Sequence, residues 1–101
     1  MKDSDTYAEF GHFLFEFSRS QLTVHGRVVN LPPSERILLT ILVSRLNQVV
    51  RRDDVMRLMG GSLLDVRAVD RTVCRLRRSL AAAKGAHILE TVRNVGYVLR
   101  P

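Results

Sequence analysis

The chain has 101 residues, of which 46% are hydrophobic and 26% charged, and a net charge of +6. This length allows one domain with a modest core. No apolar run reaches the roughly 18 residues of a membrane span, the first residues are unlike a signal peptide, and the one cysteine, Cys74, excludes a disulfide within the chain. A soluble cytoplasmic domain without membrane contact of its own is therefore expected.

The positive charge is concentrated in the second half of the chain. Residues 1–50 contain five basic and five acidic residues, whereas residues 51–101 contain eleven basic and five acidic residues. Such an imbalance favours a polyanionic partner, with nucleic acid the first candidate and an anionic membrane surface the second.

The first third of the chain predicts a small antiparallel meander. Residues 1–9 are polar and are expected to be flexible, so that the folded domain covers 10–101. Short apolar runs at 12–17, 21–25 and 28–31 are separated by turn residues. Runs of this length and spacing are typical of three consecutive strands.

Three helices are predicted to follow the meander. Pro32 and Pro33 open the first, over 34–46, where Leu38, Leu39, Leu42 and Leu46 recur at helical spacing. The second covers 52–59 and has acidic residues in its first turn, which suits the helix dipole. The third covers about 66–83 and is closed by Lys84 and Gly85.

The chain ends in two predicted strands, 87–92 and 97–100, joined by a turn in which Gly96 is expected to adopt positive φ. The predicted order is β-β-β-α-α-α-β-β. Three helices with a terminal hairpin form a winged helix, so the sequence predicts an α+β winged helix-turn-helix with an N-terminal antiparallel β-meander and a C-terminal β-hairpin wing.

The third helix separates apolar from basic residues. On a helical wheel, one arc is apolar and is expected to be buried; it consists of Val69, Val73, Leu76 and Leu80. The opposite arc carries arginines without an acidic residue at i+4 on the same face; these are Arg67, Arg71, Arg75 and Arg78, with Cys74 beside them. A solvated face usually interleaves both signs, whereas neighbouring arginines repel each other. An external anion would relieve this repulsion.

Arginine suits a DNA-reading helix because its guanidinium fork binds phosphate or the major-groove edge of guanine in a bidentate manner. Arg93 lies at the predicted tip of the hairpin, where it could enter an adjacent narrow minor groove. The alternatives are a merely solvated helix face and an ordinary solvated turn residue.

Four segments carry a family resemblance that covers about residues 10–100. "LPPSERILLTILV", "QVVRRDDVMRLMGG", "AVDRTVCRLRRSL" and "ILETVRNVGYVLR" resemble, in order and spacing, the OmpR-type winged-helix domain of bacterial transcription regulators. The most specific parts are the V-x-x-x-V-x-R-L-R-x-x-L pattern from Val69 to Leu80 and the T-V-R-x-x-G-Y hairpin from Thr91 to Tyr97.

The resemblance implies sequence-specific binding of double-stranded DNA, with a recognition helix at 66–83 in the major groove and a wing at 88–100 in the minor groove. It also implies tandem or dimeric binding, and contact with RNA polymerase through the loop 60–66. The residues implied to face DNA are Asp70, Arg71, Thr72, Cys74 and Arg75 on the helix, Arg77 and Arg78 nearer the backbone, and Thr91, Arg93 and Tyr97 on the wing.

The sequence departs from the family pattern away from the DNA face. Pro32 and Arg51 stand where the family usually has capping Ser or Thr residues, and Met59 stands where Trp is common. Together these changes are expected to weaken capping and packing by about 1–2 kcal/mol. Cys74 replaces a usual polar or basic residue, so base preference does not transfer.

The domain occurs either after a receiver domain in response regulators or first in ToxR-like regulators, often ahead of a membrane helix. The opening Met1 and the short lead "YAEFGHFLFEF", residues 7–17, favour the second arrangement slightly, and the end at Pro101 suggests a module of a longer protein.

Other functions fit the residues less well. His12, His25 and His87 are isolated in the sequence, Cys74 has no recognisable general base, and no phosphate-binding glycine loop is present, so no enzyme, cofactor or metal is predicted. An RNA-binding module would fit the charge, but the alternating phenylalanines from Phe13 to Phe17 are expected to pack against the helices. A winged-helix module for protein interaction stays open.

Overall fold

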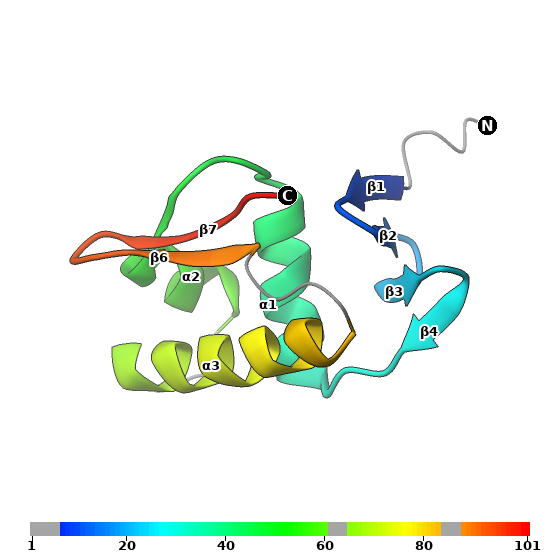
Figure 1. The fold of residues 1–101 in the computed structure, drawn as a ribbon. Helices are drawn as coiled ribbons and strands as arrows, with labels where there is room; N and C mark the ends of the chain where they lie inside the picture. Colours follow the sequence, from blue (N-terminus) through cyan, green and yellow to red (C-terminus); the bar gives the residue numbers. More distant parts are fainter. Residues whose placement is uncertain (1–6, 61–64, 84–87) are drawn as a thin grey trace.

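The computed structural model describes residues 7–60, 65–83 and 88–101, and Figure 1 shows their arrangement. Its elements are β1 (Tyr7–Phe10), β2 (Phe13–Glu16), β3 (Gln21–Val24), β4 (Arg27–Val29), α1 (Pro33–Val43), β5 (Val50–Arg51), α2 (Arg52–Leu58), α3 (Val66–Ala82), β6 (Leu89–Val92) and β7 (Gly96–Leu99). The predicted α+β winged helix with its leading meander is confirmed. None of the helices described is long and apolar enough to cross a membrane.

The leading meander has four strands rather than the predicted three. It is antiparallel with the order β1-β2-β3-β4, and Phe10 pairs with Phe13 where β1 meets β2. The expectation that residues 7–9 are flexible is wrong. Tyr7 and Glu9 are exposed while Phe10 is buried, and this half-polar pattern hid the strand in the sequence. Residues 1–6 lie outside the described residues.

The helices begin close to their predicted positions. Neither Pro32 nor Arg51, at the N-caps of α1 and α2, makes a side-chain capping bond, as expected from their chemistry. Helix α1 ends at Val43, three residues before the predicted end. The chain turns there because Asn47 adopts a φ of 66° and donates its N–H to the carbonyl of Leu99 at 3.0 Å.

A second sheet, with the order β5-β7-β6, contains the C-terminal hairpin of β6 and β7, which we call the wing. The two-residue strand β5 was not predicted from the sequence. The prediction of positive φ at Gly96 is wrong, because Asn94, with a φ of 65°, has the left-handed conformation in this turn. Gly96 instead lies in β7, where an added Cβ would be 1.9 Å from the carbonyl oxygen of Val50.

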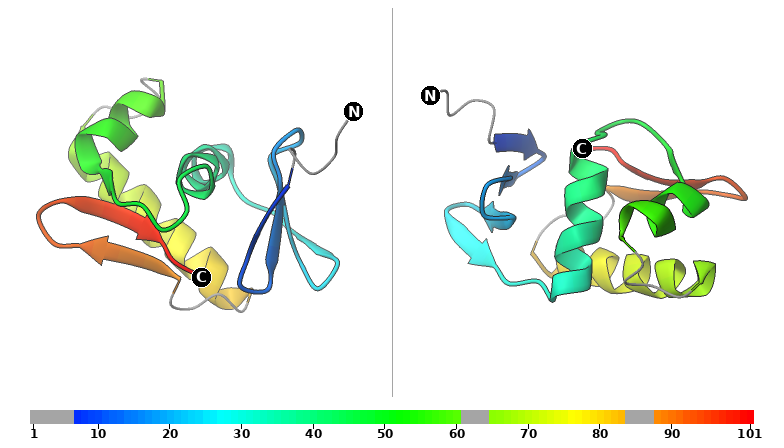
Figure 2. Two further views of the ribbon diagram at one scale, coloured as in Figure 1. Left: turned by 90° about the horizontal axis from the view of Figure 1, so that it is seen from above. Right: turned by 180° about the vertical axis from the view of Figure 1, so that it is seen from behind.

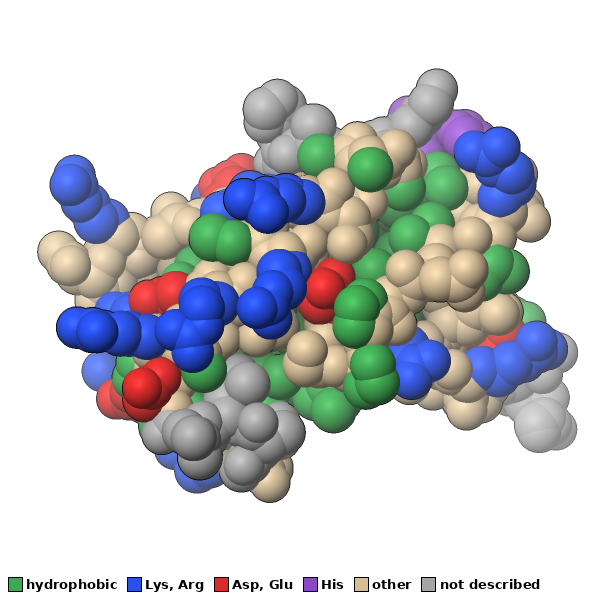
Figure 3. All heavy atoms as spheres, turned by 90° about the horizontal axis from the view of Figure 1, so that it is seen from below, with side chains coloured by type: hydrophobic (Ala, Val, Ile, Leu, Met, Phe, Trp, Pro, Cys, Tyr) green, Lys and Arg blue, Asp and Glu red, His purple; other side chains and the backbone are tan. Residues whose placement is uncertain are grey.

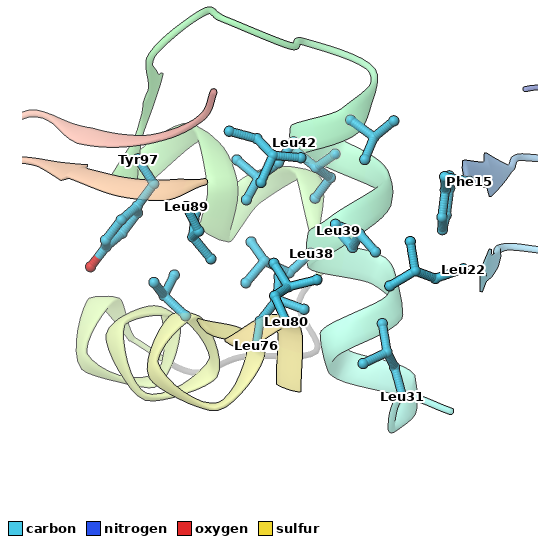
Figure 4. Close-up of a cluster of buried hydrophobic side chains, with 14 of the residues drawn as sticks. Phe15, Leu22, Leu31, Leu38, Leu39, Leu42, Leu76, Leu80, Leu89 and Tyr97 are labelled. Atoms are coloured by element: carbon cyan, nitrogen blue, oxygen red, sulfur yellow. The ribbon is translucent and has the colours of Figure 1, made fainter. Parts of the chain in front are cut away.

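Helix α1 lies between the N-terminal sheet and the rest of the domain, as the two views in Figure 2 show. It contacts α2, α3 and β7. One continuous core spans both sides of α1, and Figure 4 shows part of it. Phe15 and Leu22 pack from the N-terminal sheet, and Leu76 and Leu80 from α3. The core thereby fixes α3 and the wing to one rigid scaffold.

Candidate nucleic-acid interface

Helix α3 is built on its predicted apolar arc. Val69, Val73, Leu76 and Leu80 are each no more than 1% exposed. The helix begins where the side chain of Asp65 accepts a hydrogen bond from the backbone N–H of Ala68 at 2.9 Å, which is an N-cap. Burial of one face leaves the opposite face of this 17-residue helix directed to solvent.

The outward side of α3 carries an arginine face, defined by Arg67, Arg71, Arg75 and Arg78. All four side chains are exposed, and in the part of the chain that the structure describes none of them has a carboxylate within ion-pair distance. Figure 3, which views the molecule from the α3 side, shows basic side chains gathered there. A shallow depression of about 320 Å³ lies on this face, lined by Asp70, Arg71, Cys74, Arg75 and Arg78. Positive charge without carboxylate partners among the described residues is therefore concentrated on this face, which favours an anionic partner.

The wing presents a further arginine beyond the end of α3. Arg93 is exposed in the turn between β6 and β7, next to the left-handed Asn94. The base of α2 holds this turn, since the N–H of Arg52 donates to the carbonyl of Val95 at 3.3 Å. The exposed side chain of Arg93 is thus presented on a backbone turn that is hydrogen-bonded to the start of α2.

Two predicted DNA-facing residues lie inside the domain instead. Thr72 is 2% exposed, and its hydroxyl donates to the carbonyl of Ala68 at 2.9 Å. The prediction that Thr72 faces DNA is therefore wrong, because the apolar arc is wider than the four residues used to define it. The side chain of Tyr97 is 6% exposed and its hydroxyl donates to Asp70, so a direct wing contact through this ring is also excluded in this conformation.

Three more predicted contacts have partners within the protein. Asp70 accepts two hydrogen bonds from the guanidinium of Arg52, at 3.2 and 2.6 Å. Arg77 donates to the carbonyl of Leu89 at 3.2 Å and to the hydroxyl of Thr91 at 2.9 Å. These groups differ from the side chains of the arginine face, which make no such bonds to the described residues. Sequence spacing alone did not distinguish the two sets.

The hydrogen bonds around Asp70 also affect protonation. Burial, and secondarily the hydrogen bond to Asp70, raise the pKa of Tyr97 to about 12. The hydrogen bond to Asp70 raises the pKa of Arg52 above its ordinary value. Both groups therefore keep the protons that they donate to Asp70 at neutral pH.

His12 and His25, which are far apart in the sequence, are neighbours in the fold. The turns after β1 and β3 bring the rings of His12 and His25 together, with their centroids 5.1 Å apart. No group of three or more His, Cys, Asp or Glu side chains suited to a metal ion occurs within residues 7–60, 65–83 and 88–101. His87 and most of the predicted polymerase-contacting loop 60–66 lie outside the described residues, as do Lys84 and Gly85.

Comparison with known proteins identifies relatives of the same architecture. Residues 26–99 match the family described as "Transcriptional regulatory protein, C terminal". The heme response regulator HssR of Staphylococcus epidermidis is 32% identical over 97 residues, which cover 94% of this chain and 43% of HssR. The transcriptional regulatory protein AfsQ1 of Streptomyces coelicolor is 34% identical over 103 residues, which cover 99% of this chain and 46% of AfsQ1. The chain thus spans less than half the length of these relatives.

A solved DNA-binding domain has the same fold as this chain. The DNA-binding domain of Klebsiella pneumoniae RstA, crystallised in complex with the RstA box, superposes with a TM-score of 0.81 at 28% identity. The match covers 94% of this chain and 97% of that domain. Because the superposition covers nearly all of both chains, the leading meander, the three helices and the wing all belong to the shared architecture.

Proposed function

Since this chain belongs to the family of C-terminal domains of transcriptional regulatory proteins, we propose that it binds double-stranded DNA in a sequence-specific manner as the effector domain of a bacterial transcription regulator. Helix α3 would enter the major groove and the wing the adjacent minor groove. The observation that carries the proposal is the arginine face, whose side chains are exposed and have no carboxylate partners among the described residues. No catalytic step forms part of this function.

The dimensions and chemistry of the surface support duplex DNA as the partner. The major groove, about 12 Å wide, admits an α-helix, and arginine forks match both guanine edges and phosphates. Arg71, Cys74 and Arg75, in the middle of α3, line the depression on this side of the helix and are the proposed base readers. Arg67 and Arg78, toward the two ends of the helix, are proposed to contact phosphates. Arg93 is placed on the wing for the minor groove, where negative potential is concentrated.

Three finer features stay part of the proposal. A single module of this kind buries only about 600–1,000 Å² on DNA, which favours dimeric or tandem binding. The similarity to response regulators and the absence of a membrane-crossing helix in the described part of the chain fit a domain working in the cytoplasm. Contact of the loop 60–66 with RNA polymerase remains a prediction.

The first experiment is a salt series of binding to a random-sequence DNA duplex of about 30 base pairs, followed by fluorescence anisotropy. The wild-type chain is compared with Arg71→Ala/Arg75→Ala. Each lost phosphate contact lowers the slope of log K against log salt by about 0.9. We expect steep salt dependence for the wild type, and both weaker binding and a shallower slope for the double variant.

A matched control removes the same charge elsewhere. Arg19→Ala/Arg45→Ala takes two arginines from the turn after β2 and from the residues after α1, away from the arginine face. An equal loss in both double variants would show that net charge alone drives binding. Selection from a randomised duplex library must then return a defined motif. Preference for single-stranded RNA, or no duplex affinity at low salt, would contradict the proposal and favour an RNA-binding or protein-interaction module.

A further inference from the structure

Two residues on one edge of α3 connect the helix to the wing. Asp70 and Arg77 are seven positions apart, which places them about 10 Å apart along the helix axis. Both are partly buried, unlike the exposed arginines next to them. Their polar groups make hydrogen bonds to the wing and, for Asp70, also to α2, although both side chains remain partly exposed.

The first connection is centred on the carboxylate of Asp70. One oxygen accepts the hydroxyl of Tyr97 from β7 and the Nε–H of Arg52 at 3.2 Å, and the other accepts Nη2 of Arg52 at 2.6 Å. Arg52 is the first residue of α2. Figure 4 shows the ring of Tyr97 extending from the wing toward α3. One carboxylate therefore joins α3, α2 and the wing.

The second connection uses the guanidinium of Arg77. Its Nε–H donates to the carbonyl of Leu89, and its Nη2 donates to the hydroxyl of Thr91, both in β6. Thr91 and Tyr97 are direct cross-strand partners in the wing. Both connections therefore meet at one rung of the hairpin while they start from points two turns apart on α3. The bond from Arg77 to the carbonyl of Leu89 attaches a point away from that rung, so the contacts together restrain both the position and the tilt of the wing over α3.

We propose that Asp70 and Arg77 are positioning residues that fix the wing relative to α3, so that Arg93 and the arginine face engage neighbouring grooves together. This inference rests on the proposed function. It changes the role expected for both residues, because their polar groups are occupied within the protein rather than directed to DNA. The energetic consequence is coupling between substitutions at these positions and at Arg93.

Asp70→Ala separates positioning from simple electrostatics by the sign of its effect. Removing a carboxylate from a basic surface should strengthen binding to a polyanion if charge alone mattered. If Asp70 positions the wing, the variant instead binds the selected duplex about five- to tenfold more weakly, since coupled contacts typically change equilibria by this order. Tighter or unchanged binding by the folded variant would overturn the inference for Asp70.

Arg77→Lys tests the second connection without changing the charge. Lysine keeps the positive charge and can contact a phosphate as a point charge, but it lacks the planar fork that reaches two acceptors of β6 at once. We expect Arg77→Lys to weaken binding about as much as Arg77→Ala, while the control Arg19→Lys, an exposed arginine in the turn after β2 and outside the arginine face, stays within about twofold of the wild type. Wild-type affinity for Arg77→Lys would refute positioning.

A double-mutant cycle with Arg93→Ala identifies the route of the effect. If Arg77 acts through the wing, Arg77→Lys has little further effect once Arg93 is alanine; additive losses would mean direct contact with DNA. Thermal unfolding of each variant checks that binding is measured on folded protein. Failure of the proposed function is seen separately, as absence of duplex binding by the wild type.

A measurement without DNA completes the test. Backbone residual dipolar couplings report the orientation of residues 89–99 relative to α3. They should change in Arg77→Lys and in Asp70→Ala but not in Arg19→Lys. Unchanged couplings in the first two variants would overturn the inference whether or not the protein binds DNA.

Discussion

Replacing Gly96 with alanine should destabilise the domain through a collision of two backbones. An alanine Cβ at this position would lie 1.9 Å from the carbonyl oxygen of Val50 and 2.8 Å from Cα of Arg51. Carbon and oxygen atoms approach to about 3.3 Å, so β5 and β7 would have to separate by about 1.4 Å at this point. The pairing of Arg51 with Gly96 could not survive that displacement.

The expected loss follows from overpacking and from broken ladder hydrogen bonds. Overpacking costs about 1–3 kcal/mol, and each lost backbone hydrogen bond about 1 kcal/mol, giving a total of about 2–5 kcal/mol. For a domain of this size each kcal/mol lowers the melting temperature by about 4–8 °C. Gly96→Ala should therefore melt roughly 8–40 °C below the wild type.

Thermal unfolding followed by circular dichroism measures this difference. Gly26→Ala is the matched control, because Gly26 has a φ of 79° and an added Cβ there meets no atom within 4 Å. Only the cost of a left-handed alanine, about 1–2 kcal/mol, applies to the control. If Gly96→Ala melted no lower than Gly26→Ala, the close approach of β5 and β7 could not be the reason for glycine at this position.

Two further predictions concern stability. Asp65→Ala should lower the free energy of unfolding by about 1 kcal/mol in urea titrations, because the N-cap bond to Ala68 is lost. The control is Asp53→Ala, because Asp53 lies in the first turn of α2 but is not its N-cap. An equal loss of stability in the control would argue against the N-cap as the reason. The raised pKa of Tyr97 means that its contribution to stability is complete below pH 10 and is lost as pH rises toward 12. The stability of Tyr97→Phe should therefore fall less than that of the wild type between these pH values, and parallel curves would show that the phenol is not responsible.

The predicted strands and helices followed from local patterns. The apolar arc of α3 needs only the 3.6-residue period, and the same period placed the arginines of its outward face. Proline and the β-branched runs likewise marked the start of α1 and most of the strands. Strand β1 was missed because its exposed and buried residues alternate over only four positions. Its backbone pairing with β2 holds it in the sheet, and short-range sequence patterns do not contain that pairing.

The candidate interface was predicted as a list of residues on one helix and one hairpin. The sequence could place Asp70 and Arg77 on an edge of α3, but it could not show what faces that edge. Tyr97 and Thr91 reach it only after the wing has folded back over the helix, 27 and 14 residues away along the chain. The burial of Thr72 was missed for the same reason. How many residues of α3 are buried depends on the elements that pack against the helix, and the helical period does not contain this information.

The sequence by itself determined where the charge and the apolar periodicity lie, because both are properties of residues close together in the chain. It therefore determined the order of the three helices and of the strands other than β1 and β5, the arginine face of α3 and the exposed Arg93. The tertiary structure alone decided which polar groups remain available to a partner. Hydrogen bonds between distant segments occupy Asp70, Arg77 and Tyr97, and close contact of two strands requires Gly96. These contacts depend on distances in space, which short-range sequence patterns do not contain.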